Sequence, residues 1–93
     1  MINKNIIQIR RKLDKLDDSL LEIIKIRTKL VDLVIKNKRY KKDIVDKKRI
    51  SLILKNILIK SKKRKIDPII TRKIWKEMIK AFIAYEYRNF NKK

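Results

Sequence analysis

Residues 6–38 read IIQIRRKLDKLDDSLLEIIKIRTKLVDLVIKNK, and this stretch decides the fold. Apolar residues recur in it at the spacing of an amphipathic helix, and neither glycine nor proline interrupts it. The apolar stripe consists of Ile6, Ile9, Leu13, Leu16, Leu20, Ile23, Leu30 and Val34. A helix over residues 6–38 would be about 50 Å long, which is far more than a small monomer needs. We therefore expect it to pair with a copy of itself or to span a bundle.

A second, shorter helix is predicted after residues 39–45, which lose the helical periodicity and should form a loop. Asp46 can cap this helix, because its side chain can accept a hydrogen bond from a backbone N–H of the first turn. The helix should end within residues 60–65, a basic segment that is typical of a solvated turn and only less commonly of a phosphate site. Its buried stripe is predicted to be Ile50, Ile53, Leu54 and Ile57.

A third helix should begin at Asp67 and Pro68, with the aspartate as its cap and the proline at the first helical position. It should end near Asn89. Its apolar face is predicted to be Ile70, Ile74, Trp75, Met78, Ile79, Phe82 and Ile83. The sequence shows no strand pattern, internal repeat or linker. We therefore predict an all-α fold, one long helix and two shorter ones, in a single domain over residues 1–93.

The charge of the chain is extreme, with 29 lysine and arginine residues against 10 acidic ones and a formal net charge of +19. Such a charge favours an anionic partner, which could be nucleic acid, an anionic lipid surface or a small polyanion. A compositional bias is an equally good explanation. Lysine, isoleucine and asparagine are abundant while alanine occurs only at Ala81 and Ala84, as AT-rich coding DNA would produce.

Several kinds of chemistry are excluded because the residues they need are absent. The chain contains no cysteine and no histidine, which excludes thiol nucleophiles, histidine bases, disulfides and the usual zinc sites. It contains no glycine, which excludes phosphate-binding glycine loops and dinucleotide motifs. The start of the chain lacks the apolar core of a signal peptide, and no apolar span could cross a bilayer. A cytoplasmic location without membrane attachment is the default expectation.

Each predicted helix carries an ionisable residue where its periodicity requires an apolar one. Arg27 lies on the stripe of the first helix, and Lys38 follows it by 11 residues. On one helix the two would point within about 20° of each other and lie about 16 Å apart along the axis. Arg49 lies beside the stripe of the second helix, and Glu86 continues that of the third.

These four ions have two interpretations. Each could be a long side chain that reaches solvent from a helix edge, or Glu86 could form an intrachain ion pair with one of the arginines. Four such residues on three helices instead favour a buried polar pocket lined mainly by cations. Its natural occupant would be a small di-acid, because guanidinium and carboxylate groups pair with two hydrogen bonds.

The spacing of these residues resembles the AroQ-type chorismate mutases, a small all-helical class. The matching elements are Arg10, Leu16-Asp17, Arg27, Lys38, Asp46-x-x-Arg49, Asp67 and the stretch 75–86, so the resemblance covers about residues 9–90. It implies an intertwined homodimer of six helices with two equivalent active sites. It also implies a pericyclic rearrangement of chorismate to prephenate, in phenylalanine and tyrosine biosynthesis, without a metal, cofactor or covalent intermediate.

The resemblance also implies a role for each matching residue. Arg10, donated across the dimer interface, and Arg27 would clamp the two substrate carboxylates. Lys38 would donate a hydrogen bond to the breaking ether oxygen and to a carboxylate, and Arg49 would support the clamp. Asp46, together with the residues next to it, would bind the ring hydroxyl.

Three positions decide between related activities. Ile50 stands where chorismate mutases usually carry a glutamate that binds the ring hydroxyl, and isochorismate-pyruvate lyases on the same scaffold carry an aliphatic residue there. Phe82 replaces a small polar residue, which also favours the lyase or a divergent mutase. Glu86 stands at a position near the ether oxygen that is often glutamine, and some chorismate mutases carry glutamate there.

We therefore expect a chorismate mutase, with the lyase as the alternative. A basic helical protein that binds nucleic acid is a second alternative. It agrees with the net charge of +19 but does not explain Arg27 or Glu86 on apolar stripes, so no specific nucleic-acid binding is expected.

Overall fold

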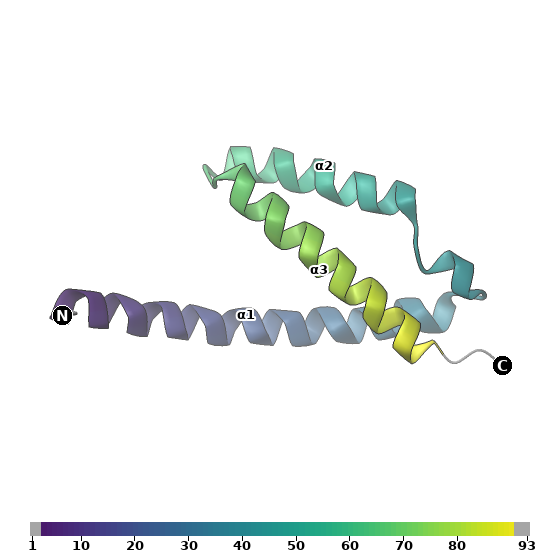
Figure 1. The fold of residues 1–93 in the computed structure, drawn as a ribbon, viewed down its shortest axis with the longest axis horizontal. Coiled ribbons are helices and arrows are strands. Elements are labelled where there is room, and N and C mark those ends of the chain that lie inside the picture. Colours follow the sequence, from purple (N-terminus) through teal and green to yellow (C-terminus); the bar gives the residue numbers. More distant parts are fainter. Residues whose placement is uncertain (1–2, 91–93) are drawn as a thin grey trace. The chain divides into compact units, whose positions relative to one another are not determined.

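The computed structural model describes residues 3–90, and this part of the chain is helical throughout its regular structure (Figure 1). The long helix is α1 (Lys4–Asn37), and the two shorter ones are α2 (Lys47–Lys63) and α3 (Pro68–Asn89). A single 3₁₀ turn, η1 (Lys41–Asp43), lies in the segment predicted as a loop. Over the described residues the prediction of an all-α fold with three helices is confirmed.

The chain divides into two compact units, Met1–Leu30 and Val31–Lys93. The first contains most of α1, and the second contains the end of α1 together with η1, α2 and α3. The single domain over residues 1–93 stays a prediction. Residues 1–2 and 91–93 lie outside the described part. The expectation that the start of the chain lacks the apolar core of a signal peptide therefore falls partly outside it.

The predicted starts of α2 and α3 are confirmed by their caps. The Asp46 carboxylate accepts a hydrogen bond of 3.0 Å from the backbone N–H of Arg49. The Asp67 carboxylate accepts one of 2.9 Å from the backbone N–H of Ile69, and Pro68 is the first residue of α3. A capping side chain of this kind contributes about 1 kcal/mol, because it satisfies a backbone donor that the helix itself leaves unpaired.

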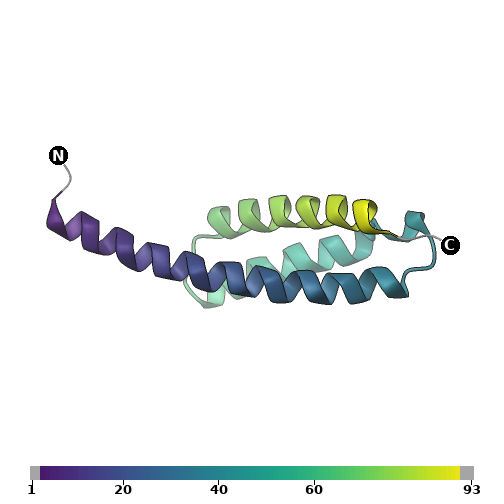
Figure 2. The same ribbon diagram turned by 90° about the horizontal axis from the view of Figure 1, so that it is seen from below.

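Helices α2 and α3 form a hairpin and contact each other; Figure 1 shows them close together at their connecting turn and diverging away from it, and Figure 2 shows the same hairpin turned by 90°. Near its turn, the hydroxyl groups of Ser61 and Thr71 lie 2.7 Å apart and are both buried. The Ser61 hydroxyl also donates a hydrogen bond of 2.6 Å to the carbonyl of Ile57. The apolar residues that are partly buried on the two helices are Ile50, Ile53, Leu54, Ile57, Trp75, Met78, Ile79, Phe82 and Ile83. Most of the two predicted stripes is therefore confirmed, although Ile70 and Ile74 are exposed.

The apolar stripe of α1 is exposed in the single chain. Its predicted members, from Ile6 to Val34, are between 39% and 60% exposed. The well-buried apolar residues of the described chain are instead Ile35 and Ile44, at the end of α1 and just after η1. No helix in the described residues is long and apolar enough to span a bilayer.

A left-handed residue ends the α2 segment. Lys65 has a φ of 58°, and the next residue, Ile66, donates a backbone hydrogen bond of 2.9 Å to the carbonyl of Ser61. This closing geometry usually employs glycine, because a Cβ atom crowds the backbone at positive φ. The chain contains no glycine, so a lysine occupies the position.

Replacing Lys65 with glycine should therefore stabilise the fold. Lys65→Gly should raise the free energy of unfolding by about 0.5–1 kcal/mol, because relief of the left-handed strain exceeds the added entropy of the unfolded chain. Urea denaturation measures this change. Lys55→Gly, at an exposed position within α2, is the matched control and should lower stability by about 1 kcal/mol. A loss of stability in both variants would contradict this explanation.

Candidate active site

Lys38 and Glu86, two of the predicted site residues on different helices, form a direct side-chain contact in the structure. The Lys38 Nζ atom lies 3.0 Å from Glu86 Oε1, and the side chains are 19% and 11% exposed. The same Nζ atom donates a hydrogen bond of 3.0 Å to the backbone carbonyl of Ile44. Glu86 thus forms an intrachain ion pair, as one interpretation of the sequence allowed, with a lysine as partner.

Local structure fixes both members of this pair. Lys38 is the first residue after α1, and its backbone N–H donates a hydrogen bond to the carbonyl of Ile35. Ile44 is only 2% exposed, which holds in place the carbonyl that accepts from Lys38. Glu86 lies near the end of α3, on the same stripe as Phe82 and one turn after it. Lys38 and Glu86 therefore meet where the ends of two helices approach each other.

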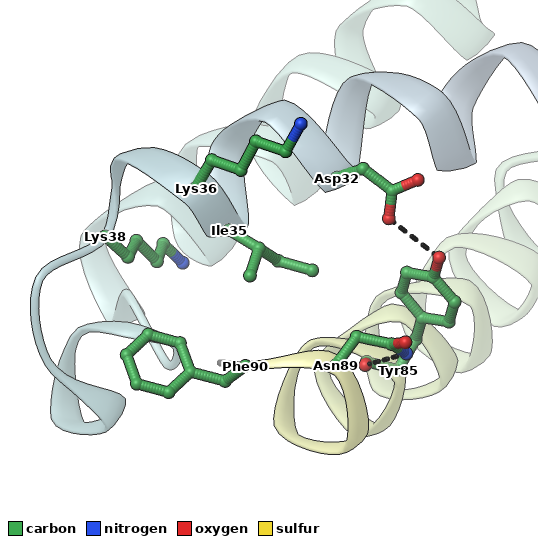
Figure 3. A pocket seen from close by; sticks show the side chains of 7 residues that line it. All are labelled: Asp32, Ile35, Lys36, Lys38, Tyr85, Asn89 and Phe90. Carbon is green, nitrogen blue, oxygen red and sulfur yellow. Dashed lines mark hydrogen bonds between the residues drawn. The ribbon is translucent and has the colours of Figure 1, made fainter. Parts of the chain in front are cut away.

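A second long-range hydrogen bond lies next to this pair. The Tyr85 hydroxyl donates a hydrogen bond of 2.7 Å to the Asp32 carboxylate on α1 (Figure 3). This bond, together with partial burial and the negative charge of Asp32, raises the pKa of Tyr85 above its ordinary value of 10.0, while Arg88 opposes the effect. The ring of Phe82 meets that of Tyr85 edge to face, with centroids 6.4 Å apart.

An open pocket of about 640 Å³ adjoins both contacts (Figure 3). It is lined by Asp32, Ile35, Lys36, Lys38, Tyr85, Asn89 and Phe90. Several of its polar groups already have protein partners: Tyr85 donates to Asp32, and the Asn89 amide donates to the Tyr85 carbonyl. This pocket shares only Lys38 with the predicted site.

Sequence reasoning missed the residues of this pocket other than Lys38. Asp32 and Tyr85 are separated by 53 positions, and neither interrupts an apolar stripe, so no periodic signal connects them. Their one local sign is that Tyr85 directly precedes Glu86.

The remaining predicted residues on α2 and α3 have distinct places. Asp46 caps α2, and Arg49 is exposed on its first turn. Ile50 lines a different open pocket, of about 320 Å³, with Leu54, Lys76, Glu77, Ile79, Lys80 and Ile83. Phe82 is partly buried against Tyr85. The predicted binding roles of these residues stay predictions.

Arg10 and Arg27 both belong to the first unit, Met1–Leu30. Arg10 is exposed, and Arg27 is partly buried although its neighbours on α1 are mostly exposed. Within the described residues, no group of three or more side chains is placed to hold a metal ion. In the second unit the Lys38 ammonium faces the Glu86 carboxylate, and Lys38 also lines the pocket of about 640 Å³.

Comparison with known protein families gives a match over most of the chain. The family model of chorismate mutase type II matches residues 9–87. The chain belongs to the chorismate mutase type II family. This confirms the resemblance drawn from the spacing of Arg10, Arg27, Lys38 and Arg49, and it makes the protein an enzyme, a chorismate mutase of the isomerase class. No curated protein and no solved structure gives a significant match to the chain.

The Tyr85–Asp32 bond should give this chorismate mutase a defined pH dependence of stability. Because folding raises the pKa of Tyr85, the stabilisation is complete below pH 10.0 and is lost as the pH rises through the folded-state value. The difference in unfolding free energy between wild type and Tyr85→Phe should therefore shrink at alkaline pH. Urea denaturation across the pH series measures it, with Tyr87→Phe, at an exposed position, as control. A difference that stays constant with pH would contradict the assignment.

Proposed function

We propose that the protein rearranges chorismate to prephenate, with Lys38 and Glu86 at the ether oxygen of the substrate. The observation that carries this proposal is the 3.0 Å contact between Lys38 and Glu86 in a chain that belongs to the chorismate mutase type II family. The reaction breaks one carbon–oxygen bond and forms one carbon–carbon bond within the same molecule. It consumes no other reactant.

The enzyme has two tasks in such a rearrangement. It holds the substrate in the compact conformer in which the two reacting carbons meet. The loss of conformational entropy then occurs on binding and no longer adds to the activation barrier. The enzyme also stabilises the negative charge that develops on the ether oxygen as its bond breaks. The Lys38 ammonium is suited to the second task because the Ile44 carbonyl fixes its position before the reaction begins. One such donor is worth about 10²–10³-fold in rate.

The other predicted residues would bind the substrate. Arg10 and Arg27 would hold the two carboxylates, with Arg49 in support and Asp46 near the ring hydroxyl. Arg10 lies 17 residues before Arg27, which is about 25 Å along a helix and a turn of roughly 100°. No arginine side chain spans that distance, so Arg10 would come from a partner chain.

A homodimer would supply that arginine and cover the apolar stripe of α1. The stripe residues are between 39% and 60% exposed in one chain, and such a row of aliphatic side chains is costly to leave in water. Pairing α1 with its copy would bury them and bring Arg10 of one chain to the site of the other. We propose the intertwined six-helix dimer on these grounds, together with the cytoplasmic location expected from the sequence.

The second candidate activity is that of an isochorismate-pyruvate lyase, which splits isochorismate into salicylate and pyruvate. Ile50 favours it, because an aliphatic side chain cannot accept the hydrogen bond of a ring hydroxyl. Glu86 favours the mutase.

The deciding experiment offers chorismate and isochorismate separately to the purified protein and identifies the products by chromatography. We expect prephenate from chorismate with a chelator present and no cofactor added. Salicylate and pyruvate from isochorismate, without prephenate from chorismate, would establish the lyase. Turnover of neither substrate would refute both, and tight sequence-selective nucleic-acid binding at physiological salt would then support the basic binding protein.

Glu86 should make the activity depend on pH. A carboxyl group donates to the ether oxygen only when it is protonated, so the carboxylate that accepts from Lys38 must take up a proton before it can donate, and kcat/KM should fall as the pH rises. Glu86→Gln carries an amide donor at every pH and should flatten the profile. Steady-state kinetics of both proteins over the same pH range make the comparison. An unchanged profile in the variant would show that another group titrates.

The shared site predicts complementation between two inactive variants. Arg10→Ala and Arg27→Ala should each be nearly inactive as homodimers. When they are refolded together in equal amounts, half of the dimers should be mixed, and each mixed dimer would contain one intact site. About a quarter of wild-type activity should therefore return. If mixed dimers form, as native mass spectrometry can show, and no activity returns, Arg10 does not act across the interface.

A further inference from the structure

Two consecutive residues of α3 contact Asp32, near the end of α1, and Lys38, the first residue after α1. Tyr85 donates to Asp32 at 2.7 Å, and Glu86 accepts from Lys38 at 3.0 Å. Consecutive residues on a helix point about 100° apart, so these two bonds leave α3 in different directions. Their partners are six positions apart, or about 9 Å along a helix axis. Two attachment points fix the rotation of α3 as well as its distance, which a single contact could not do.

In the proposed reaction, hydrogen bonds to the substrate replace the one between Lys38 and Glu86. An ether oxygen that receives hydrogen bonds from Lys38 and from Glu86, once the Glu86 carboxylate has taken up a proton from solvent, must lie between the two side chains. With two bonds of about 2.8 Å meeting at a normal angle, the two side chains must separate to about 5 Å. The direct Lys38–Glu86 bond of 3.0 Å is therefore replaced during turnover. The Tyr85–Asp32 bond uses no atom that the ether oxygen needs.

We propose that the Tyr85–Asp32 hydrogen bond is a positioning contact, which holds α3 against α1 at the correct rotation while Lys38 and Glu86 separate to receive the substrate. Asp32 and Tyr85 act through Glu86 and do not touch the reacting atoms. This inference rests on the proposed function, since it assigns a role within the same reaction.

The surroundings of Tyr85 suit a contact that persists. A hydroxyl that donates to a carboxylate forms a short, strong bond, and 2.7 Å is typical of this type. Phe82 packs edge to face against the tyrosine ring, and the Arg88 guanidinium lies 6.0 Å from the ring centroid. The Asn89 side chain donates a hydrogen bond of 2.9 Å to the Tyr85 carbonyl. Asp32 accepts from the Tyr85 hydroxyl, and Phe82 and Arg88 lie next to its ring, so the side chain has three neighbours that hold its orientation.

The test compares kinetics of Tyr85→Phe, Asp32→Leu and Asp32→Asn with chorismate. Tyr85→Phe and Asp32→Leu should each lower kcat about 10- to 100-fold while KM changes less than about threefold, because a displaced Glu86 weakens an interaction made chiefly in the transition state. Asp32→Asn keeps an acceptor oxygen and should recover most of the activity. The double variant Tyr85→Phe/Asp32→Leu should be no worse than either single variant, since both remove the same bond.

Two controls separate positioning from general stability. Tyr87→Phe removes a hydroxyl at an exposed position two residues away and should leave kcat unchanged. Thermal denaturation shows whether each variant is folded at the assay temperature. A fall in kcat that matches the unfolded fraction would overturn the proposal, and so would additive losses in the double variant.

An NMR titration of the Tyr85 ring tests the contact without any substrate. Its pKa should be raised in the wild type and should fall toward 10.0 in Asp32→Leu. Wild-type prephenate formation with an unaltered kcat in Tyr85→Phe would overturn this inference alone. A wild type that turns over neither chorismate nor isochorismate would overturn it together with the proposed function.

Discussion

The ion pair between Lys38 and Glu86 is the contact on which the rest of the site depends. Two charged side chains that are largely withdrawn from water are expensive to hold, and their mutual attraction often fails to offset the loss of hydration. A well-packed aliphatic pair would serve stability at least as well. The proposed function would give the pair a role beyond folding, because a pre-oriented ammonium is what a breaking ether bond requires.

The helices place this pair through local interactions that are readable in the sequence. Asp46, Asp67 and Pro68 define where α2 and α3 begin, and each acts within one helical turn of itself. Capping residues of this kind can be recognised from the sequence without knowledge of the tertiary structure. The positions of Lys38 and Glu86 were predictable for a related reason, since an ion on an apolar stripe marks a place where the interior must satisfy a charge.

Other features were not predictable because they depend on contacts between distant residues. Asp32 and Tyr85 lie at positions where a polar or aromatic residue violates no pattern, so only the fold reveals their hydrogen bond. Lys65 takes a left-handed conformation that sequence reasoning associates with glycine. Ile70 and Ile74 continue the apolar periodicity of α3 but are exposed in the single chain. Periodicity identifies a helix face, but it does not say how far along the helix the packing extends.

The most direct test of the central claim, that Lys38 faces the breaking bond of chorismate, is the kcat/KM of Lys38→Met. Lys55→Met is the matched control, since it removes an exposed ammonium within α2, away from the pocket that Lys38 lines. Circular dichroism confirms that both variants are folded. The account predicts a loss of about 10²–10³-fold for Lys38→Met and little change for Lys55→Met. Equal prephenate formation by the two folded variants would contradict it.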